Sequence, residues 1–409
     1  MKKEKKRLTI LNQFFYPDYA ATGQLLYSLS KSLYKKGLKI NVLTSFPGYS
    51  YVKKQNIIDE NDRSYKIKRF SISKLLILKR SPKLIKALIF CLNIFIRLLF
   101  YNNKKELILY TSEPLFLPVF GYFLYKLKSL NFIIILYDLY PEILIDLKIL
   151  GKNNMIIKAW QYLNELTYEK SEEIIVLSKD MKNKILNNYK INPKKIKIIP
   201  SWADTEKIYP IPRSRNWFIK KHQINNKFII LYSGNQGRLH DLETLINAAK
   251  FLKNDRNILF LFIGDGLQNK KLKEFVTSNN LDNCKFLPYQ KLIDLKFSLS
   301  CADLGIVSIR EDSIGCVAPS KLYGYLAAGK PLAVISPKNS YLKDLITKKE
   351  LGKWFENGNF KDLVSFIIEL KNSKDLQKQL KANCLNYLKE NASIEIISEN
   401  YFKVIKKYL

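Results

Sequence analysis

Short, nearly continuous apolar runs recur along the chain and alternate with amphipathic stretches. Runs of this kind are typical of parallel strands that helices cover on both faces. The pattern predicts an α/β fold with two doubly wound parallel sheets, each the core of one domain. The first series of runs comprises 8–15, 40–44, 107–111, 132–137, 174–177 and 196–199, and the second comprises 228–232, 259–263, 285–287, 304–308 and 331–335.

The two series are separated by residues 200–226, which contain three prolines and show no clean periodicity. We place the linker there and expect a first domain over 1–202 and a second over 203–391. A length of 409 residues accommodates two such domains. In doubly wound sheets, ligands bind beyond the carboxyl ends of the strands. The loops that follow the strands are therefore the first place to search for chemistry.

The loop after the first run carries Ala21-Thr22-Gly23 at the start of a helical pattern. Small residues at a strand-to-helix turn let backbone N–H groups approach an anion, so Thr22 and Gly23 are candidate substrate contacts. A tight turn capped by Thr22 is the alternative. A dinucleotide fingerprint would require the spacing G-x-G-x-x-G, and Gly23 is the only glycine of this loop, which disfavours NAD.

A glycine-rich turn follows the first run of the second series and carries Gly234, Asn235, Gly237 and Arg238. Arginine binds two oxygens at once and keeps its charge, which suits a diphosphate. A solvated arginine on a turn is the alternative. The sequence Gly-Asp-Gly at 264–266 is more typical of turn chemistry than of a ligand contact.

The segment 310–331 has the highest density of candidate residues. A loop that contains Gly315 leads through Pro319 and Ser320 into a helix that opens with Lys321. The free N–H groups of that helix would add to the positive charge of the lysine. An ordinary capped helix explains the boundaries, but it does not explain why glycines and cations gather at so many strand ends.

Several short motifs follow one another along nearly the whole chain. They are Tyr-Pro at 16–17 with Ala-Thr-Gly at 21–23, Asp-Leu-Tyr-Pro-Glu at 138–142, Pro-Ser-Trp-Ala-Asp at 200–204, and Pro-Ser-Lys at 319–321 before Ala-Ala-Gly-Lys-Pro at 327–331. In this order they resemble glycosyltransferase family 4, closest to its bacterial O-antigen, capsule and colanic-acid branch. The resemblance implies a GT-B fold, in which two Rossmann-like domains face each other across a cleft. It also implies that a C-terminal helix, at about 392–409, packs back on the first domain.

The resemblance further implies a retaining transfer from a nucleotide sugar, without a metal ion or other cofactor. Gly23, Arg238, Ser320 and Lys321 would surround the donor diphosphate. The catalytic residues that we expect are Asp138, Glu142, Arg238 and Lys321, with the two acids facing the reacting sugar or the acceptor. The expected substrate-binding residues are Thr22, Gly23, Gly234, Asn235, Gly237, Glu311, Gly315, Pro319 and Ser320.

The chain departs from the family pattern at the ribose site. Many members have two glutamates, separated by seven residues, before Ala-Ala-Gly, and the second holds the ribose. Alignment on 327–329 puts Cys316 and Gly324 at these positions. We therefore expect backbone contacts or Glu311 to bind the ribose, and Gly324→Ala to obstruct the donor. The family lysine after the glycine-rich turn falls near His240, which leaves Arg238 as the better cation.

The chain is strongly basic, with 69 Lys and Arg against 36 Asp and Glu and a net charge of +33. Such a surface attracts phosphates, anionic lipid or nucleic acid, although abundant Lys, Asn, Ile and Tyr indicate compositional drift. Residues 65–105 contain eleven basic and no acidic residues. Within them, 84–101 is an apolar stretch with one polar stripe, which predicts a helix in the membrane interface rather than across it. A crossover helix buried against the first sheet is the alternative.

We therefore expect an enzyme that moves a sugar from a nucleotide-sugar donor, UDP-linked, to a lipid-linked saccharide acceptor in cell-surface polysaccharide or O-antigen synthesis. Its expected place is the cytoplasmic face of the plasma membrane. A nucleotide-sugar epimerase of the same fold is an alternative. A nucleic-acid-binding protein is another, but charge alone supports it, so no nucleic-acid partner is expected. The five scattered cysteines and two histidines predict reduced thiols and no zinc site.

Overall fold

The computed structural model describes residues 7–18, 20–46, 65–70, 83–100 and 106–409. The chain forms two compact units. Unit 1 comprises Met1–Ser201, Gly315–Ala318 and Ile394–Leu409, and unit 2 comprises Trp202–Ile314 and Pro319–Ser393. The sequence analysis divides the chain at 202/203 and does not foresee that a short segment of the second series, Gly315–Ala318, is part of unit 1.

Unit 1 is built on a parallel sheet of seven strands in the order β3-β2-β1-β4-β5-β6-β7. The apolar runs predicted six of them and missed β3, an edge strand whose lysines alternate with apolar residues and so leave no continuous run. The strands are β1 (Arg7–Leu11), β2 (Lys39–Ser45), β3 (Tyr65–Phe70), β4 (Glu106–Thr111), β5 (Phe132–Leu136), β6 (Glu173–Val176) and β7 (Ile196–Ile198).

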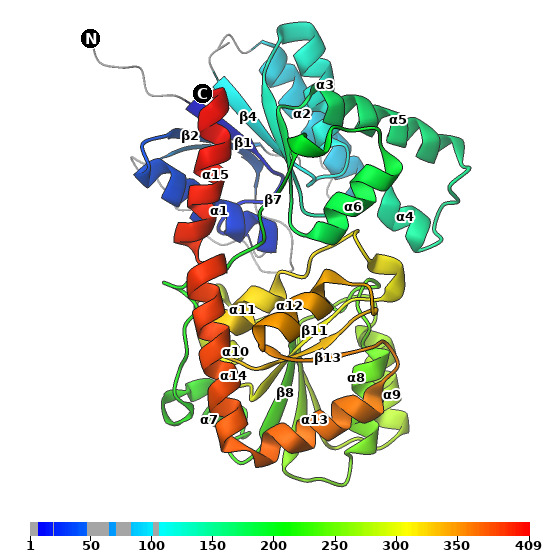
Figure 1. Ribbon diagram of the computed structural model, residues 1–409, viewed down its shortest axis with the longest axis vertical. Helices are drawn as coiled ribbons and strands as arrows, with labels where there is room; N and C mark the ends of the chain where they lie inside the picture. Colours follow the sequence, from blue (N-terminus) through cyan, green and yellow to red (C-terminus); the bar gives the residue numbers. More distant parts are fainter. Residues whose placement is uncertain (1–6, 19, 47–64, 71–82, 101–105) are drawn as a thin grey trace. The chain divides into compact units, whose positions relative to one another are not determined.

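The helices of unit 1 cover both faces of this sheet (Figure 1). Because parallel crossovers are right-handed, α1 lies on one face, and α2, α3 and α5 lie on the other. The C-terminal helix α15 packs along α1, where Ser32 bonds to Ser398 (2.8 Å) and Lys36 pairs with Glu399 (2.6 Å). The helices are α1 (Ala21–Lys35), α2 (Lys83–Leu99), α3 (Leu117–Lys128), α4 (Glu142–Asp146), α5 (Met155–Lys170), α6 (Lys179–Asn188) and α15 (Ile394–Ile405).

Unit 2 contains a parallel sheet in the order β10-β9-β8-β11-β12-β13. Five strands match the second series of runs. The sixth, at the edge, has only four residues and one of them is a lysine, so the pattern missed it. The strands are β8 (Phe228–Ser233), β9 (Ile258–Ile263), β10 (Cys284–Leu287), β11 (Leu304–Ser308), β12 (Leu332–Ile335) and β13 (Gly352–Phe355).

Helices surround the sheet of unit 2 and bury its strands in an apolar core. In chain order they are α7 (Trp217–Lys221), α8 (Glu243–Phe251), α9 (Asn269–Ser278), α10 (Leu295–Ser300), α11 (Lys321–Ala327), α12 (Tyr341–Lys349), α13 (Phe360–Asn372) and α14 (Lys374–Tyr387).

The stretch 200–226, expected as a linker, is largely folded into unit 2. Phe218 of α7 is fully buried, and the Arg213 guanidinium pairs with Asp303 at 3.1 Å and bonds to the carbonyl of Asn225. Prolines removed the helical periodicity on which the sequence analysis relied. The connection between the units is accordingly shorter than we expected.

Helix α2 corresponds to the apolar stretch 84–101 and ends at Leu99. One face is buried in unit 1, as the crossover alternative had it, through Ala87, Phe90, Cys91, Ile94 and Leu98. A second apolar row, Ile85, Leu88, Leu92 and Ile96, remains 42–51% exposed. None of the described helices has the length and apolar character to cross a membrane. The basic residues at 71–82 and 101–105 lie outside the described residues.

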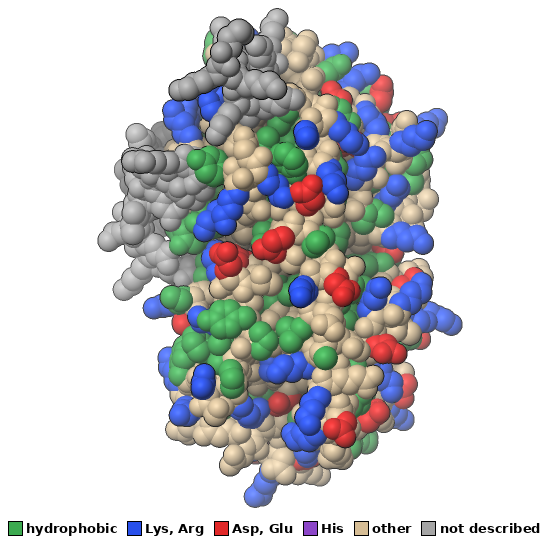
Figure 2. Space-filling view, turned by 60° about the vertical axis from the view of Figure 1, so that its left-hand side comes forward, with side chains coloured by type: hydrophobic (Ala, Val, Ile, Leu, Met, Phe, Trp, Pro, Cys, Tyr) green, Lys and Arg blue, Asp and Glu red, His purple; other side chains and the backbone are tan. Residues whose placement is uncertain are grey.

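On the face that Figure 2 shows, Lys and Arg side chains are scattered, and Asp and Glu are interspersed among them. A nucleic-acid groove requires a continuous basic stripe. The scattered arrangement on this face gives the nucleic-acid alternative no structural support.

Candidate active site

The strongest candidate site in unit 2 is built around Lys321, the first residue of α11. Its ammonium lies over the ring of Tyr232, 4.0 Å from the centroid, and donates to the Tyr232 hydroxyl. No described carboxylate pairs with this lysine. Burial in this environment lowers the pKa of Lys321 to about 7. The ammonium is therefore a partly desolvated cation that an anion would stabilise.

His240 lies beside Lys321, with its Nε2 atom 3.5 Å from the ammonium. Its Nδ1 atom is 2.7 Å from the carbonyl oxygen of Ser308. A carbonyl only accepts, so Nδ1 carries the proton and the Nε2 lone pair faces the lysine. Burial and the charge of Lys321 lower the pKa of His240 to about 3. The position at which the family alignment expected a lysine thus holds a neutral imidazole that adds no charge.

Tyr325 ties α11 to the end of β8. Its hydroxyl accepts the N–H of Ser233 (2.9 Å) and donates to the carbonyl of Leu231 (2.8 Å). The ring packs on Gly305, where a Cβ would lie only 2.6 Å from it. This buried crosslink holds the glycine-rich turn next to Lys321. The sequence analysis missed Tyr325, although its place in the motif before Ala-Ala-Gly marked it as a helix residue facing the sheet.

The turn after β8 requires glycine for conformation and for space. Gly234 has φ +132°, and a Cβ there would lie 3.5 Å from the Cε of Lys321. The 264–266 turn packs against this turn, and the N–H of Gln236 donates to the carbonyl of Asp265 (2.8 Å). A Cβ at Gly264 would come within 2.1 Å of the Gly234 oxygen. The structure therefore explains the Gly-Asp-Gly turn as packing beneath the candidate site.

The remaining candidates of unit 2 lie on the same two loops. Arg238 is exposed and forms no hydrogen bond or ion pair with the described part of the chain. The N–H of Arg310 donates to the carbonyl of Leu239 (3.0 Å), which joins the loop of Glu311 to the turn of Arg238. Contacts of Lys321 with Tyr232 and Gly234 join the loop of Pro319 and Ser320 to that turn. Asn235 holds the turn through its carbonyl, which accepts from the Tyr232 hydroxyl (2.7 Å).

Gly324 does not occupy the place that the sequence analysis gave it. A Cβ at this position would lie 3.2 Å from Cδ1 of Leu299 in α10. The crowding of Gly324→Ala would therefore fall on the packed interface between α10 and α11. The expected steric block of the donor has no basis in this geometry.

Unit 1 gathers three carboxylates near the carboxyl ends of β1, β4 and β5. The pKa of Glu113 is raised to about 7, chiefly by burial; the hydrogen bond from the Thr22 hydroxyl lowers it, and the charges of Asp138 and Asp18 contribute to the rise. Burial raises the pKa of Asp138 to about 6. Raised carboxyl pKa values in one cluster are typical of functional sites. Only Asp138 was a candidate from the sequence, although Glu113 follows β4 as Asp138 follows β5.

Asp138 is positioned by its backbone. Ser112 Oγ accepts the N–H groups of Tyr137 (2.9 Å) and Asp138 (3.2 Å). The Asp138 side chain forms no hydrogen bond with the residues that the structure describes. It borders a cavity of about 20 Å³ next to Tyr140 and Trp160, enough for about one water molecule. This carboxylate is available to a ligand.

Three expected site residues of unit 1 also have packing or hydrogen-bonding roles within the unit. Glu142 is buried and accepts hydrogen bonds from Tyr189 and Asn188, so it is committed to internal partners. Gly315 has φ +70°, and a Cβ there would lie 2.8 Å from the carbonyl oxygen of Asp180. A Cβ at Gly23 would lie 3.0 Å from the backbone of residues 14–15, so glycine lets α1 approach that segment closely.

Thr22 is not the cap of α1. The N-cap residue is Ala20, which forms no side-chain capping bond, and the Thr22 hydroxyl donates to Glu113 instead. The capped-turn alternative is therefore wrong, and Thr22 joins the carboxylate cluster. Among the described residues, no group of His, Cys, Asp and Glu is arranged to hold a metal ion.

Residues 214–386, most of unit 2, match the family described as glycosyl transferases group 1. Among curated proteins, the chain is 26% identical to the probable glycosyltransferase WbjE of Pseudomonas aeruginosa, over 59% of this chain and 60% of that protein. It is 23% identical to the putative colanic acid biosynthesis glycosyl transferase WcaI of Escherichia coli K12, over 77% and 79%. The match to WbjE thus spans less than two thirds of that relative.

Solved structures resemble the chain over nearly its full length. HepE of Anabaena, in complex with UDP and glucose, gives a TM-score of 0.75 at 13% identity, covering 98% of this chain and all of that one. WaaG, a glycosyltransferase of lipopolysaccharide biosynthesis, gives 0.70 at 13% identity, covering 97% and 99%. The two Rossmann-like units therefore form a GT-B fold, and residues 214–386 resemble the glycosyl transferases group 1 family.

Proposed function

We propose that the protein is a retaining glycosyltransferase that moves a sugar from a UDP-linked donor to a lipid-linked saccharide in cell-surface polysaccharide synthesis. The observation that carries the proposal is the Lys321 group, a partly desolvated cation without a carboxylate partner beside a glycine turn. The match of residues 214–386 to a glycosyltransferase family supports it. The named functions of WcaI and WaaG support the polysaccharide pathway, and the UDP bound to HepE supports the donor base.

The donor diphosphate would bind between the turn of Gly234 and the start of α11. Lys321 and Arg238 would stabilise the negative charge that grows on the leaving diphosphate, together with the free N–H groups at the start of α11. In a front-face transfer, the leaving diphosphate accepts the proton of the acceptor hydroxyl while the sugar bond to the diphosphate breaks. This chemistry requires neither a histidine base nor a metal ion.

The carboxylate cluster of unit 1 would serve the sugar and the acceptor. The Asp138 side chain forms no hydrogen bond within the described part of the chain, and its negative charge would stabilise the cation-like sugar in the transition state. Glu113, whose pKa lies near 7, would orient the acceptor by accepting a hydrogen bond from a hydroxyl group other than the attacking one. Glu142 has no part in this scheme, because it is buried and its Oε1 atom already accepts hydrogen bonds from Tyr189 and Asn188.

We place the protein at the cytoplasmic face of the membrane that carries its acceptor. Support comes from the exposed apolar row of α2, formed by Ile85, Leu88, Leu92 and Ile96. Helix α2 is buried on one face and exposes apolar side chains on a second face. Exposure of apolar surface to water is unfavourable, and insertion into a lipid leaflet would cover it.

The decisive experiment is turnover of a panel of UDP-, GDP- and ADP-linked sugars with a polyprenyl-diphosphate saccharide, followed by the release of nucleoside diphosphate and by NMR of the new anomeric centre. Lys321→Ala and Arg238→Ala should each lower kcat about 10²- to 10³-fold, since preorganised charge acts mainly on the transition state. Arg238→Lys should recover part of the activity. Lys330→Ala, which removes a half-buried lysine just after the same helix, is the matched control.

Two outcomes would overturn the proposal. Near-normal kcat in both Lys321→Ala and Arg238→Ala would mean that the leaving diphosphate binds elsewhere. Consumption of a nucleotide sugar without any requirement for an acceptor would favour the epimerase alternative.

A further inference from the structure

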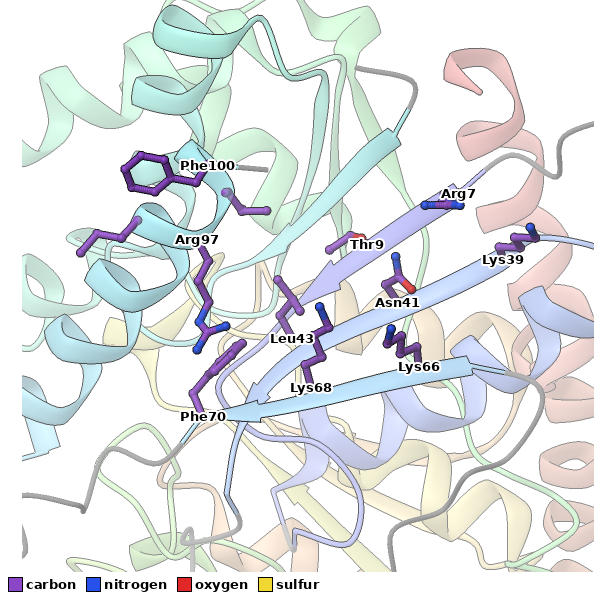
Figure 3. Close-up of a pocket in the computed structure, with 12 residues that line it drawn as sticks. Arg7, Thr9, Lys39, Asn41, Leu43, Lys66, Lys68, Phe70, Arg97 and Phe100 are labelled. Carbon is purple, nitrogen blue, oxygen red and sulfur yellow. The ribbon is translucent and has the colours of Figure 1, made fainter. Parts of the chain in front are cut away.

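Unit 1 contains a cavity of about 580 Å³ between α2 and the sheet face formed by β1, β2 and β3 (Figure 3). Thr9, Asn41 and Leu43 form part of its floor. Central strands of a parallel sheet are normally covered by helices on both faces. Asn41 and Leu43 are nevertheless only half-buried on this face. The cavity lies on the face of the sheet and is separate from the carboxylate cluster at the strand ends.

Five cations line this cavity. Arg7, Lys39, Lys66 and Lys68 come from the three strands, and Arg97 comes from α2, where it lies 4.2 Å from the ring centroid of Phe70. None of the five forms an ion pair with a described residue. Arg7 and Lys39 are direct neighbours in the register of β1 and β2. On its other side Arg7 stands opposite Glu106 of β4, which is one carboxylate against the five cations.

The wall of the cavity is apolar on the α2 side. Ile96, Leu98 and Phe100 line it there, Phe70 of β3 adds an aromatic ring, and Phe100 is 79% exposed. Ile96 also belongs to the exposed apolar row of α2, so the apolar wall continues onto the outer surface of the helix. A free inorganic anion would leave this wall unused. The combination of a cationic floor and an apolar wall suits an anionic amphiphile.

The floor also offers a hydrogen-bond acceptor. The amide nitrogen of Asn41 donates to Glu106 Oε1 at 2.9 Å, and the Thr9 hydroxyl donates to the same oxygen. This bond fixes the orientation of the amide, because only its nitrogen can donate. The amide oxygen of Asn41 is left without a partner among the described residues. It would accept a hydrogen bond from a hydroxyl group of a ligand.

We propose that this cavity binds the headgroup of one anionic phospholipid that carries hydroxyl groups, with phosphatidylglycerol as its simplest form. The phosphate would lie among the strand cations, a headgroup hydroxyl would donate to Asn41, and the acyl chains would follow Phe100 and Ile96 toward the exposed row of α2. The proposal builds on the membrane attachment inferred above and names its ligand. A nucleic-acid strand would leave the apolar wall uncovered.

The test uses dihexanoyl phosphatidylglycerol below its critical micelle concentration, measured by titration calorimetry with the full chain. Dihexanoyl phosphatidylcholine and inorganic phosphate are the comparison ligands. We expect saturable binding of one phosphatidylglycerol, at least tenfold tighter than either comparison ligand. Lys66→Glu with Lys68→Glu should weaken it at least tenfold, and the neutral pair Lys66→Gln with Lys68→Gln should weaken it less. Lys152→Glu with Lys158→Glu changes the net charge equally at exposed sites of unit 1 and is the matched control.

Equal binding of both phospholipids, or equal loss of binding in the control pair, would overturn the proposal, because either result means adsorption without a site. Binding of inorganic phosphate as tightly as the lipid would show a phosphate site and would also contradict it. Thermal unfolding of each variant confirms that the fold is intact. The titration contains neither a sugar donor nor a sugar acceptor. Lipid binding can therefore hold if the proposed sugar transfer fails, and sugar transfer can hold if lipid binding fails.

Discussion

At the residue scale, the protonation of Lys321 links donor binding to pH. The free lysine has its pKa lowered to about 7, so it is mostly neutral at pH 8. A diphosphate favours the charged form and raises this pKa, so its binding must take up a proton. We expect UDP binding at pH 8 to take up close to one proton and to weaken as the pH rises above 7. Calorimetry in two buffers of different ionisation enthalpy measures this uptake.

Lys321→Arg is the control for this prediction, because arginine stays charged over the whole range. The variant should bind UDP with no proton uptake from this position and with a flat pH dependence from 7 to 9. Proton-neutral binding to the unaltered protein at pH 8 would show that Lys321 does not contact the diphosphate.

The carboxylate cluster makes stability depend on pH in a defined direction. Glu113 has a folded pKa of about 7 against a reference of 4.5, and the pKa of Asp138 is raised as well. Between pH 4.5 and pH 7 the unfolded chain binds fewer protons than the folded chain, so the free energy of unfolding falls as the pH rises. In the unaltered protein, Glu113 should account for about 2 to 3 kcal/mol of the decrease in unfolding free energy between pH 4.5 and 7.5. Glu113→Gln should abolish that part of the decrease.

Denaturant unfolding across this pH range measures the effect, and the exposed Glu311→Gln is the matched control. A slope that is the same in Glu113→Gln and in the unaltered protein would mean that folding does not raise the pKa of Glu113.

At the element scale, continuous apolar runs marked eleven strands. β3 and β13 lack such a run because lysines interrupt them. Edge position alone is not the reason, since β7 and β10 also lie at sheet edges and were predicted. Strand-end loops likewise led to Lys321, Gly234 and Asp138. The sequence could not predict which side chains are already used in internal hydrogen bonds. It does not show that Glu142 bonds to Tyr189, or that Nδ1 of His240 bonds to the carbonyl of Ser308.

Helix α11 and strand β8 act together through Tyr325, which touches neither the expected donor position nor the acceptor. Tyr325→Phe leaves the buried N–H of Ser233 without its partner, which costs about 1 to 3 kcal/mol. We expect a lower melting temperature for the variant. We also expect KM for the donor to rise several-fold with a smaller change in kcat, because the turn of Gly234 is held less firmly beside Lys321.

Tyr323→Phe on the same helix is the matched control, since the hydroxyl of Tyr323 forms no hydrogen bond with the described residues. It should leave KM unchanged. A purely structural role for Tyr325 would lower the melting temperature without moving KM at temperatures where the variant is fully folded, and that result would remove Tyr325 from the site.

At the scale of the whole molecule, a net charge of +33 attracts any anionic surface, so charge alone cannot distinguish membrane attachment from adsorption. The exposed row of α2 provides the distinction, because apolar insertion is insensitive to salt while adsorption is screened. Leu88→Glu with Leu92→Glu should reduce binding to anionic vesicles at least tenfold at 0.5 M salt. The measurement is sedimentation with vesicles at low and high salt.

The control is Leu267→Glu with Ile293→Glu, which places the same charges at exposed apolar positions of unit 2. Both double variants lower the net charge equally, so they should lose the same amount of salt-sensitive binding. Only the α2 variant should lose the part that persists at high salt, since burial in lipid of the exposed halves of two leucine side chains contributes about 1.5 to 3 kcal/mol. Equal losses at high salt would mean that charge alone carries the attachment, and α2 would then be a crossover helix with an unused outer face.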